Sequence, residues 1–206
     1  MQARTLAVAC CVAVASLSGC ALTNEQIELS YTPQAGVSRI AGAENVPVGV
    51  QVTDQRLDKS KVSSKKNGFG MEMAPITAAE DVAVTVRKAI EQELRARGFR
   101  LDSSDALVKV DADVTRFYND HKMGVFAGDA VADLNLSVSV KSKDGMLLYA
   151  KQIAAQGKEA NTQLATGNNA RLALDRALAN GMKMLFDDKA FLSALLSVSK
   201  SPSASK

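Results

Sequence analysis

A short apolar run that ends in a cysteine decides which part of this chain can fold as a domain. The chain opens with one positive charge at Arg4, continues with mostly apolar residues from Thr5 to Leu17, and then reaches Ser18-Gly19-Cys20. A membrane-spanning helix needs about 20 apolar residues, so this run is too short to cross a bilayer. A basic start, a short apolar run and a small-residue exit are typical of a secretory signal peptide. We therefore predict that residues 1–19 are a signal peptide that is removed.

The residues at the exit, Leu17-Ser18-Gly19-Cys20, resemble the lipobox of bacterial lipoproteins. The resemblance implies a diacylglycerol on the Cys20 sulfur, an acyl chain on the same residue, and cleavage just before it. Two or more acyl chains anchor a protein stably, whereas one chain holds it only marginally. Ala21, rather than an aspartate, follows the cysteine, and the usual sorting pattern then implies the outer membrane, facing the periplasm. The alternative is an ordinary signal peptide with a chance cysteine.

The composition limits what the mature chain can be. Cys10 and Cys11 leave with the signal peptide and Cys20 is acylated, so we expect no disulfide and no free thiol. The formal charge of the whole chain is only +3 and Arg4 is lost, which argues against nucleic-acid binding. There is no tryptophan, so no stacking platform for sugars or bases is indicated. The chain has no second long apolar run, so no transmembrane helix is predicted.

Alternation of apolar and polar residues predicts four strands, at 46–52, 106–114, 129–142 and 146–156. Lys143-Asp144-Gly145 joins the last two strands, and Asp-Gly suits a type I′ hairpin turn. We expect residues 20–45 to be the lipidated cysteine and a tether, with a short edge strand as an alternative near 27–31. Residues 57–76 form a long connection in which a short strand is expected within 69–74.

Two amphipathic helices are predicted. Thr77 and Glu80 have the spacing of a capping box, and an apolar stripe at four-residue spacing follows them. Gly98 suits the left-handed position after the helix end. A second helix is expected over 168–187, followed by a short apolar segment and a polar tail at 198–206 that we expect to be disordered.

The order strand, helix, three strands, helix predicts an α+β fold. We expect one domain at 46–197, with a mainly antiparallel twisted sheet of about four strands and two amphipathic helices packed on one of its faces. The chain also resembles the YajG-like bacterial lipoproteins. The matching features are the lipobox, the strand that ends in Thr53-Asp54-Gln55-Arg56, the Arg97-Gly98-Phe99 helix end, the strand at 106–114, the hairpin and the final helix. The resemblance implies an outer-membrane-type lipoprotein of a family without an established enzymatic activity, and no functional residues can be carried over from it.

Few residues are candidates for chemistry. His121, the only histidine, is expected on a surface loop at 118–122, without partners for a triad or a zinc site. Asp111 and Asp113 share a strand face and are expected to be solvated rather than catalytic. Asp54 and Arg56 are expected to pair and fix a turn. We predict no cofactor and no metal site.

A cluster of lysines opens the long connection after the first strand. Such a cluster can contact a partner or anionic headgroups, at about 1 kcal/mol per lysine near a charged surface, or it can be a solvated loop. Its members are Lys59, Lys61, Lys65 and Lys66.

The sequence therefore favours a non-enzymatic lipoprotein of the outer membrane that binds an envelope protein through the 57–76 segment or a free sheet edge. The alternative is an accessory lipoprotein in lipid or lipopolysaccharide handling, which would need an apolar pocket between helices and sheet. A hydrolase is a third hypothesis, which a buried pair of titratable groups in a cleft would support.

Overall fold

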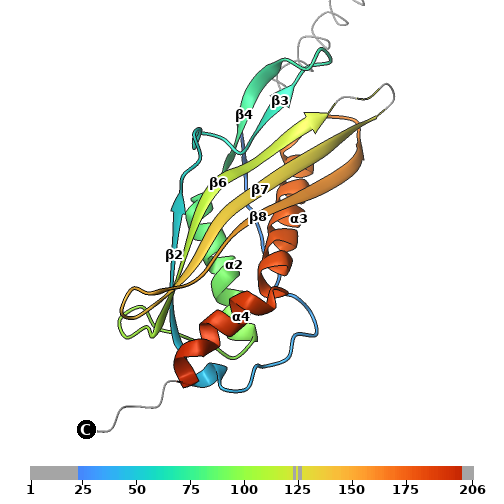
Figure 1. Cartoon of the computed structure of the whole chain (residues 1–206). Helices are drawn as coiled ribbons and strands as arrows, with labels where there is room; N and C mark the ends of the chain where they lie inside the picture. Colours follow the sequence, from blue (N-terminus) through green and yellow to red (C-terminus); the bar gives the residue numbers. More distant parts are fainter. Residues whose placement is uncertain (1–22, 123, 125–126, 201–206) are drawn as a thin grey trace, which may run out of the picture.

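The structure is a computed structural model that describes residues 23–122, 124 and 127–200. This part of the chain forms an α+β fold with two mixed sheets and three α-helices (Figure 1). The strands are β1 (Glu25–Ile27), β2 (Pro47–Asp54), β3 (Ser63–Lys66), β4 (Glu72–Ala78), β5 (Arg100–Leu101), β6 (Val108–Lys122), β7 (Gly128–Ser142) and β8 (Leu147–Thr162). The helices are α2 (Val82–Ala96), α3 (Gly167–Phe186) and α4 (Lys189–Leu196), with 3-10 turns at Ala43–Asn45 and Ser197–Lys200.

The larger sheet has five strands in the order β5-β2-β6-β7-β8. Strands β6, β7 and β8 form the predicted antiparallel meander, with Val110 opposite Val140 and Val138 opposite Lys151. Strand β2 instead runs parallel to β6, with Val48 opposite Val108, and parallel to β5. A parallel pair needs a crossover, which here passes through the smaller sheet and α2.

The smaller sheet, in the order β1-β4-β3, was not predicted as a sheet. Strands β3 and β4 make a hairpin, and β1 adds to β4 in parallel, with Glu25 opposite Ile76. The connection at 57–76 thus holds one whole strand and the start of a second, where the sequence predicted one short strand within 69–74. Because both sheets contain parallel pairs, the prediction of one mainly antiparallel sheet of about four strands was wrong, whereas the α+β class is confirmed.

The segment expected as a tether packs against the domain over much of its length. An edge strand is present as β1, but it lies at Glu25–Ile27 and overlaps the alternative at 27–31 only at Ile27. Ala43 is fully buried. The backbone N–H of Ile40 donates to the carbonyl of Arg97 at 2.9 Å. The lipidation site and residues 1–22 lie outside the described residues, as does the end of the predicted tail, whereas 198–200 belong to the last 3-10 turn.

Helices α2 and α3 pack against the large sheet, as predicted, and bury their apolar stripes on it (Figure 1). The N-cap of α2 is Asp81, whose carboxylate accepts a 2.7 Å hydrogen bond from the Ala83 N–H. The prediction of a capping box that starts at Thr77 was wrong, because Thr77 still belongs to β4. Gly98 has a φ of +94°, which confirms the left-handed helix end. Helix α3 begins after Thr166, which caps the Asn169 N–H.

The hairpin between β7 and β8 is confirmed, but its turn is of another type. The Gly145 N–H donates to the Ser142 carbonyl at 2.9 Å, and Gly145 has a φ of +86° while Asp144 keeps a negative φ. A type I turn followed by a left-handed glycine fits these values better than a type I′ turn.

Candidate functional site

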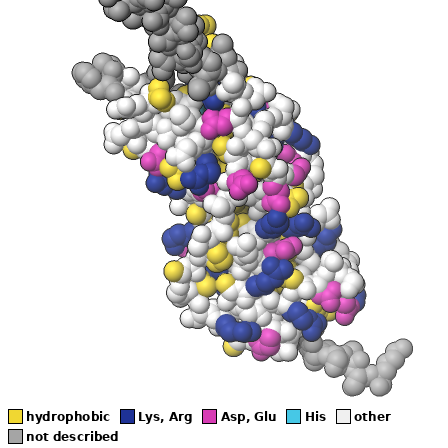
Figure 2. Space-filling view, turned by 180° about the vertical axis from the view of Figure 1, so that it is seen from behind, with side chains coloured by type: hydrophobic (Ala, Val, Ile, Leu, Met, Phe, Trp, Pro, Cys, Tyr) yellow, Lys and Arg dark blue, Asp and Glu magenta, His cyan; other side chains and the backbone are white. Residues whose placement is uncertain are grey.

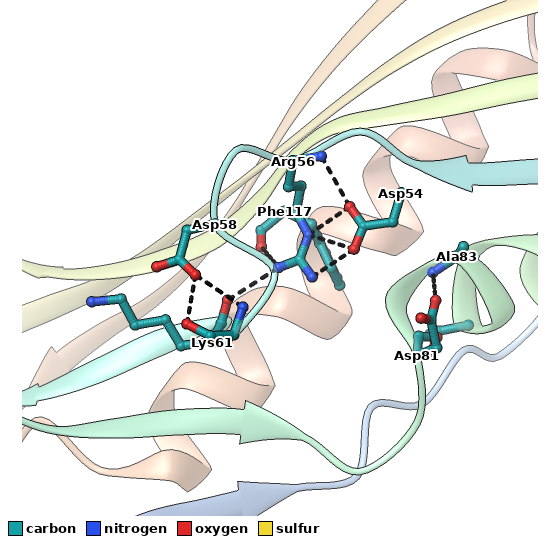
Figure 3. A network of polar contacts seen from close by, with 9 residues as sticks. Asp54, Arg56, Asp58, Lys61, Asp81, Ala83 and Phe117 are labelled. Carbon is teal, nitrogen blue, oxygen red and sulfur yellow. Dashed lines mark hydrogen bonds and ion pairs between the residues drawn. The ribbon is translucent and has the colours of Figure 1, made fainter.

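A buried ion pair closes the end of β2. The Arg56 guanidinium donates to the Asp54 carboxylate through Nε at 3.0 and 3.1 Å and through Nη2 at 2.8 Å, and both side chains are more than nine-tenths buried (Figure 3). Its Nη1 donates to the carbonyls of Lys61 at 3.1 Å and Phe117 at 3.3 Å. The predicted pairing of Asp54 with Arg56 is therefore confirmed, and the pair ties three segments of backbone together.

The ionisation of Asp54 follows from this geometry. Burial alone would raise the pKa of the Asp54 carboxyl, but the hydrogen bonds and the charge of Arg56 outweigh burial and hold that pKa below its ordinary value. Asp54 is therefore charged at neutral pH, and the pair is a structural clamp rather than an acid–base couple.

A β-bulge in β6 lies beside this clamp. The register between β6 and β7 shifts between Val114 and Arg116, so the side chains that follow change face. A hollow of about 340 Å³ lies here, and the apolar side chain of Leu57 at its rim is fully exposed. The hollow is lined by Arg56, Leu57, Asp58, Thr115, Arg116, Phe117, Tyr118 and Asn135.

Past the bulge, β6 carries polar residues into the interior. Asn119 is 1% exposed, and its amide donates to the Ser63 hydroxyl at 2.9 Å. Ser63 is on β3, so this contact joins the two sheets. The Asn119 N–H also donates to the Val62 carbonyl at 2.8 Å.

His121 lies at the end of β6 and is 4% exposed, so its prediction as a surface-loop residue was wrong. The physical reason is the bulge, which turns Phe117, Asn119 and His121 inward where simple alternation from Val114 points them out. Neither ring nitrogen has a hydrogen-bond partner among the described residues. Burial lowers the pKa of His121, and the Lys66 charge lowers it further against the opposing effect of Asp120.

A second hollow, of about 280 Å³, opens beside His121. It lies between the turn that joins β3 to β4 and the segment that leads into α3. The described residues at its wall include Lys66, Gly68, His121, Lys122 and Leu164. With one neutral histidine and no acid partner for it, this hollow offers no general acid–base pair.

The predicted lysine cluster is largely neutralised by carboxylates. Lys61 pairs with Glu72 at 2.5 Å, and Lys65 pairs with Glu25 at 3.2 Å. Lys66 pairs with Asp120. The fourth lysine, Lys59, is exposed in the loop before β3. The charge that this cluster presents is therefore smaller than the sequence indicates, and its contact with a partner or a headgroup stays a prediction.

Asp111 and Asp113 lie on the solvent side of β6, as predicted, because they alternate with buried valine and alanine. Asp111 pairs with Lys141 at 3.0 Å and Lys109 at 3.2 Å. Burial opposes ionisation of Asp111, but these lysines outweigh it and lower its pKa. The carboxylates are thus part of a solvated charged face. On the face shown in Figure 2, basic and acidic side chains are likewise interspersed.

Sequence reasoning missed a buried charged cluster on α2. Glu93 is fully buried and pairs with Arg97, whose guanidinium also stacks 4.5 Å from the centre of the Phe186 ring. The Glu93 carboxylate accepts hydrogen bonds from the Tyr31 hydroxyl and, at 2.8 Å, from the Gln34 N–H. The sequence did hold a signal, since Glu93 follows Ile90 by three residues on the buried stripe. The cluster fastens the segment before β2 to α2.

Residues 23–122, 124 and 127–200 contain no group of three histidine, cysteine, aspartate or glutamate side chains placed to hold a metal ion. No helix in this part of the chain is both long and apolar enough to span a membrane.

The fold and these sites define a small α+β domain with structural ion pairs and solvent-facing hollows, and comparison with known proteins agrees with that class. The family model described as "Uncharacterized lipoprotein" (Lipoprotein_16) matches residues 33–195, so this chain belongs to that family, which confirms the YajG-like resemblance. Membership implies a lipid-anchored protein of the cell envelope. No curated protein matches the sequence.

Solved structures share the fold, and two of them serve as examples. Protein XCC0632 from Xanthomonas campestris, of the DUF330 family, is 13% identical and superposes with a TM-score of 0.56, over 87% of this chain and 98% of that one. A second, described as an uncharacterized protein, is 12% identical with a TM-score of 0.51, over 79% of this chain and 95% of that one. At these identities the likeness concerns the fold alone.

Proposed function

We propose that this chain is a non-enzymatic lipoprotein, acylated on Cys20 and held at the periplasmic face of the outer membrane, that binds a protein partner of the envelope. The lipobox and the family support the anchor, and Ala21 after the cysteine supports the outer membrane. The observation that carries the binding role is the hollow beside Leu57.

This hollow has the composition of a protein-binding surface. Protein interfaces are enriched in arginine and tyrosine around a central apolar anchor. Here Arg116 and Tyr118 flank a fully exposed Leu57, whose side chain gains about 1.5–3 kcal/mol when a partner covers it. The Asp54–Arg56 clamp beneath keeps the loop in place, so little ordering is needed on binding.

The titratable side chains support a non-enzymatic role. The buried acids Asp54 and Glu93 are each paired with an arginine, and His121 is buried and neutral without an acid beside its nitrogens. A general base needs both a poised pKa and a reachable proton on a substrate. The hydrolase hypothesis requires a buried pair of titratable groups in a cleft, and these residues do not form one.

Lipid or lipopolysaccharide handling is the second candidate. The hollow beside His121 favours this role, because the apolar side chain of Leu164 in its wall is exposed. Against it, the space between helices and sheet is filled by fully buried side chains, which leaves no acyl-sized groove among them. They include Leu134, Leu136, Leu174, Leu178 and Met182.

Photocrosslinking in cells tests the proposal. A photoreactive residue replaces Leu57, and a matched control replaces Met184, which is 47% exposed on α3. We expect one dominant protein adduct from position 57 that is absent from position 184, and mass spectrometry identifies it. Adducts mainly with lipid or lipopolysaccharide would instead support the second candidate, and equal patterns at the two positions would overturn the binding role.

Fractionation tests the anchor separately. Replacing Cys20 with alanine removes the sulfur that carries the diacylglycerol, so Cys20→Ala should leave the outer-membrane fraction and keep an uncleaved or miscut signal peptide. If the variant still fractionates with the outer membrane as the wild type does, the lipid anchor is not at Cys20.

A further inference from the structure

One end of the molecule gathers exposed apolar side chains. Phe69 and Met71, in and beside the turn between β3 and β4, are 90% and 58% exposed. Leu164, in the segment that leads into α3, is 70% exposed. Leu164 lines the hollow beside His121, and so do Asn67 and Gly68, which directly precede Phe69 in the turn, so the three side chains lie at the same end of the molecule. We call these three residues the apolar tip.

The chain enters the fold facing this same end. Strand β1 runs parallel to β4, with Glu25 opposite Ile76 and Ile27 opposite Ala78. Going backwards from Glu25 therefore means going toward Glu72 and the turn that precedes it. Glu25 is fixed there on both sides, by its ion pair with Lys65 at 3.2 Å and by accepting the Gly167 N–H at 3.1 Å.

The length of chain before β1 matches the distance to the tip. Glu25 is the fifth residue after Cys20, and an extended chain spans at most about 17 Å over five residue steps. Glu72 lies four residues beyond the level of Glu25, about 13 Å along the strand direction. An acylated Cys20 can therefore reach the level of the tip and cannot reach far past it.

The charges at this end suit a bilayer surface. The lysines that border the tip, Lys65 and Lys66, are paired with Glu25 and Asp120, so they add little net charge. Lys122 is exposed at the rim of the hollow, where it can meet an anionic headgroup. The main contribution is then apolar, from large side chains that water now surrounds.

We infer that the apolar tip, Phe69, Met71 and Leu164, inserts into the interfacial layer of the membrane that holds the acylated Cys20. The inference rests on the proposed anchor and adds the orientation of the domain: the tip lies on the lipid and the long strands of the large sheet lead away from it (Figure 1). The Leu57 hollow at the β6 bulge is then about 20 Å from the lipid, because Lys122 lies six residue steps beyond Arg116 along β6.

Site-specific fluorescence tests this orientation. The mature chain has no cysteine besides the acylated Cys20, so a single added cysteine takes a polarity-sensitive dye. Phe69→Cys and Leu164→Cys place the dye at the tip, and Met146→Cys places it at the far end of the sheet, where the side chain is 62% exposed. The lipidated protein is reconstituted in vesicles of phosphatidylethanolamine and phosphatidylglycerol that carry a nitroxide-labelled lipid.

We expect blue-shifted emission and several-fold stronger lipid quenching at positions 69 and 164 than at 146. In a Phe69→Ser/Leu164→Ser variant, a dye at Met71→Cys should lose its quenching down to the level of position 146, because the apolar anchors are gone. Quenching at positions 69 and 164 no stronger than at 146, or a protein adduct at 69 in cells without lipid quenching, would overturn the inference. Mass spectrometry of the reconstituted protein shows whether Cys20 is acylated, which separates failure of the anchor from failure of the orientation.

Discussion

Asn119 and Ser63 join the two sheets by reciprocal hydrogen bonds. The side-chain amide of Asn119 donates to the Ser63 hydroxyl at 2.9 Å, and that hydroxyl donates to the backbone carbonyl of Asn119 at 2.9 Å. Both residues are almost fully buried. Leaving a buried polar group without a partner costs more free energy than its hydrogen bond contributes to stability. Removing either side chain should therefore destabilise the fold.

Replacing Ser63 with alanine should therefore lower the free energy of unfolding by about 1–3 kcal/mol, because it leaves the Asn119 amide without its acceptor. Denaturant titration followed by circular dichroism measures the change. Ser60→Ala is the control, since the Ser60 hydroxyl is exposed and bonds only to Asp58 nearby. Equal losses in the two variants would mean that the link between the sheets contributes nothing specific.

The Asp54–Arg56 clamp predicts a larger loss. Arg56→Met leaves the Asp54 carboxylate buried without its countercharge, and breaking a buried pair costs about 3–5 kcal/mol. Arg56→Lys should recover only part of the stability, because an ammonium cannot bond to the carboxylate twice and reach the Phe117 carbonyl as well. Full recovery by lysine would show that charge alone matters at this position.

The same clamp sets a pH dependence at the acid end. The pKa of Asp54 is lower in the folded chain than its ordinary value of 3.8, so the unfolded chain binds a proton first as the pH falls. The stability from this carboxylate is complete above pH 3.8 and is lost below it. Thermal melts of the wild type and Asp54→Asn should therefore converge as the pH falls below this value.

His121 predicts a second pH dependence, at milder acidity. Its folded-state pKa lies below 6.5, so between that value and 6.5 only the unfolded chain is protonated and stability falls as the pH is lowered. His121→Leu removes the effect, and near neutral pH it should cost little because it also removes two unpartnered nitrogens. Because His121 is the only histidine, its imidazole signals in a proton NMR titration report the pKa directly. A midpoint at or above 6.5 would contradict the buried placement.

Much of the fold could be predicted from periodicity. Strand β7 and the part of β6 up to Val114 alternate over many residues, and the apolar stripe of α2 repeats over several turns, so these patterns predicted their elements correctly. The small sheet could not be predicted in this way, because β1 has three residues and β3 has four, too few for alternation to show. The parallel pairing of β2 depends on a crossover that no local pattern records.

The site was predictable where partners are close in sequence. Asp54 and Arg56 are two residues apart and could be paired from spacing alone. Asn119 and His121 were not recognised as buried, because a single extra residue at the bulge reverses which side chains point inward. Phe117 was the available signal, since a phenylalanine out of phase with Val114 indicates that the buried face has changed.

The stripe of α2 can be tested at Ile90, which is fully buried. Ile90→Ala removes a large aliphatic side chain from the core and should cost about 2–5 kcal/mol in unfolding free energy. Arg87→Ala, on the exposed side of the same helix, should change stability little. An unchanged melting temperature for Ile90→Ala would contradict the assignment of this face.

The closest approach of helix to sheet predicts the most sensitive glycine. A Cβ on Gly157 of β8 would lie 2.1 Å from the Ala173 carbonyl oxygen and 2.3 Å from the Ala177 nitrogen, both backbone atoms of α3. The neighbouring Gln156 carbonyl accepts a 2.8 Å hydrogen bond from Asn180 of the same helix, so α3 cannot simply move away. Overpacking a core typically costs about 1–3 kcal/mol, and Gly157→Ala should destabilise the fold by at least this amount.

Gly68→Ala is the matched control, because nothing lies within 4 Å of a Cβ there. The two variants are compared by denaturant titration on the same preparation. If Gly157→Ala were as stable as Gly68→Ala, α3 would have to lie farther from β8 than the structure places it. The apolar tip would then lose its fixed position as well, since Leu164 is held by the segment that enters α3.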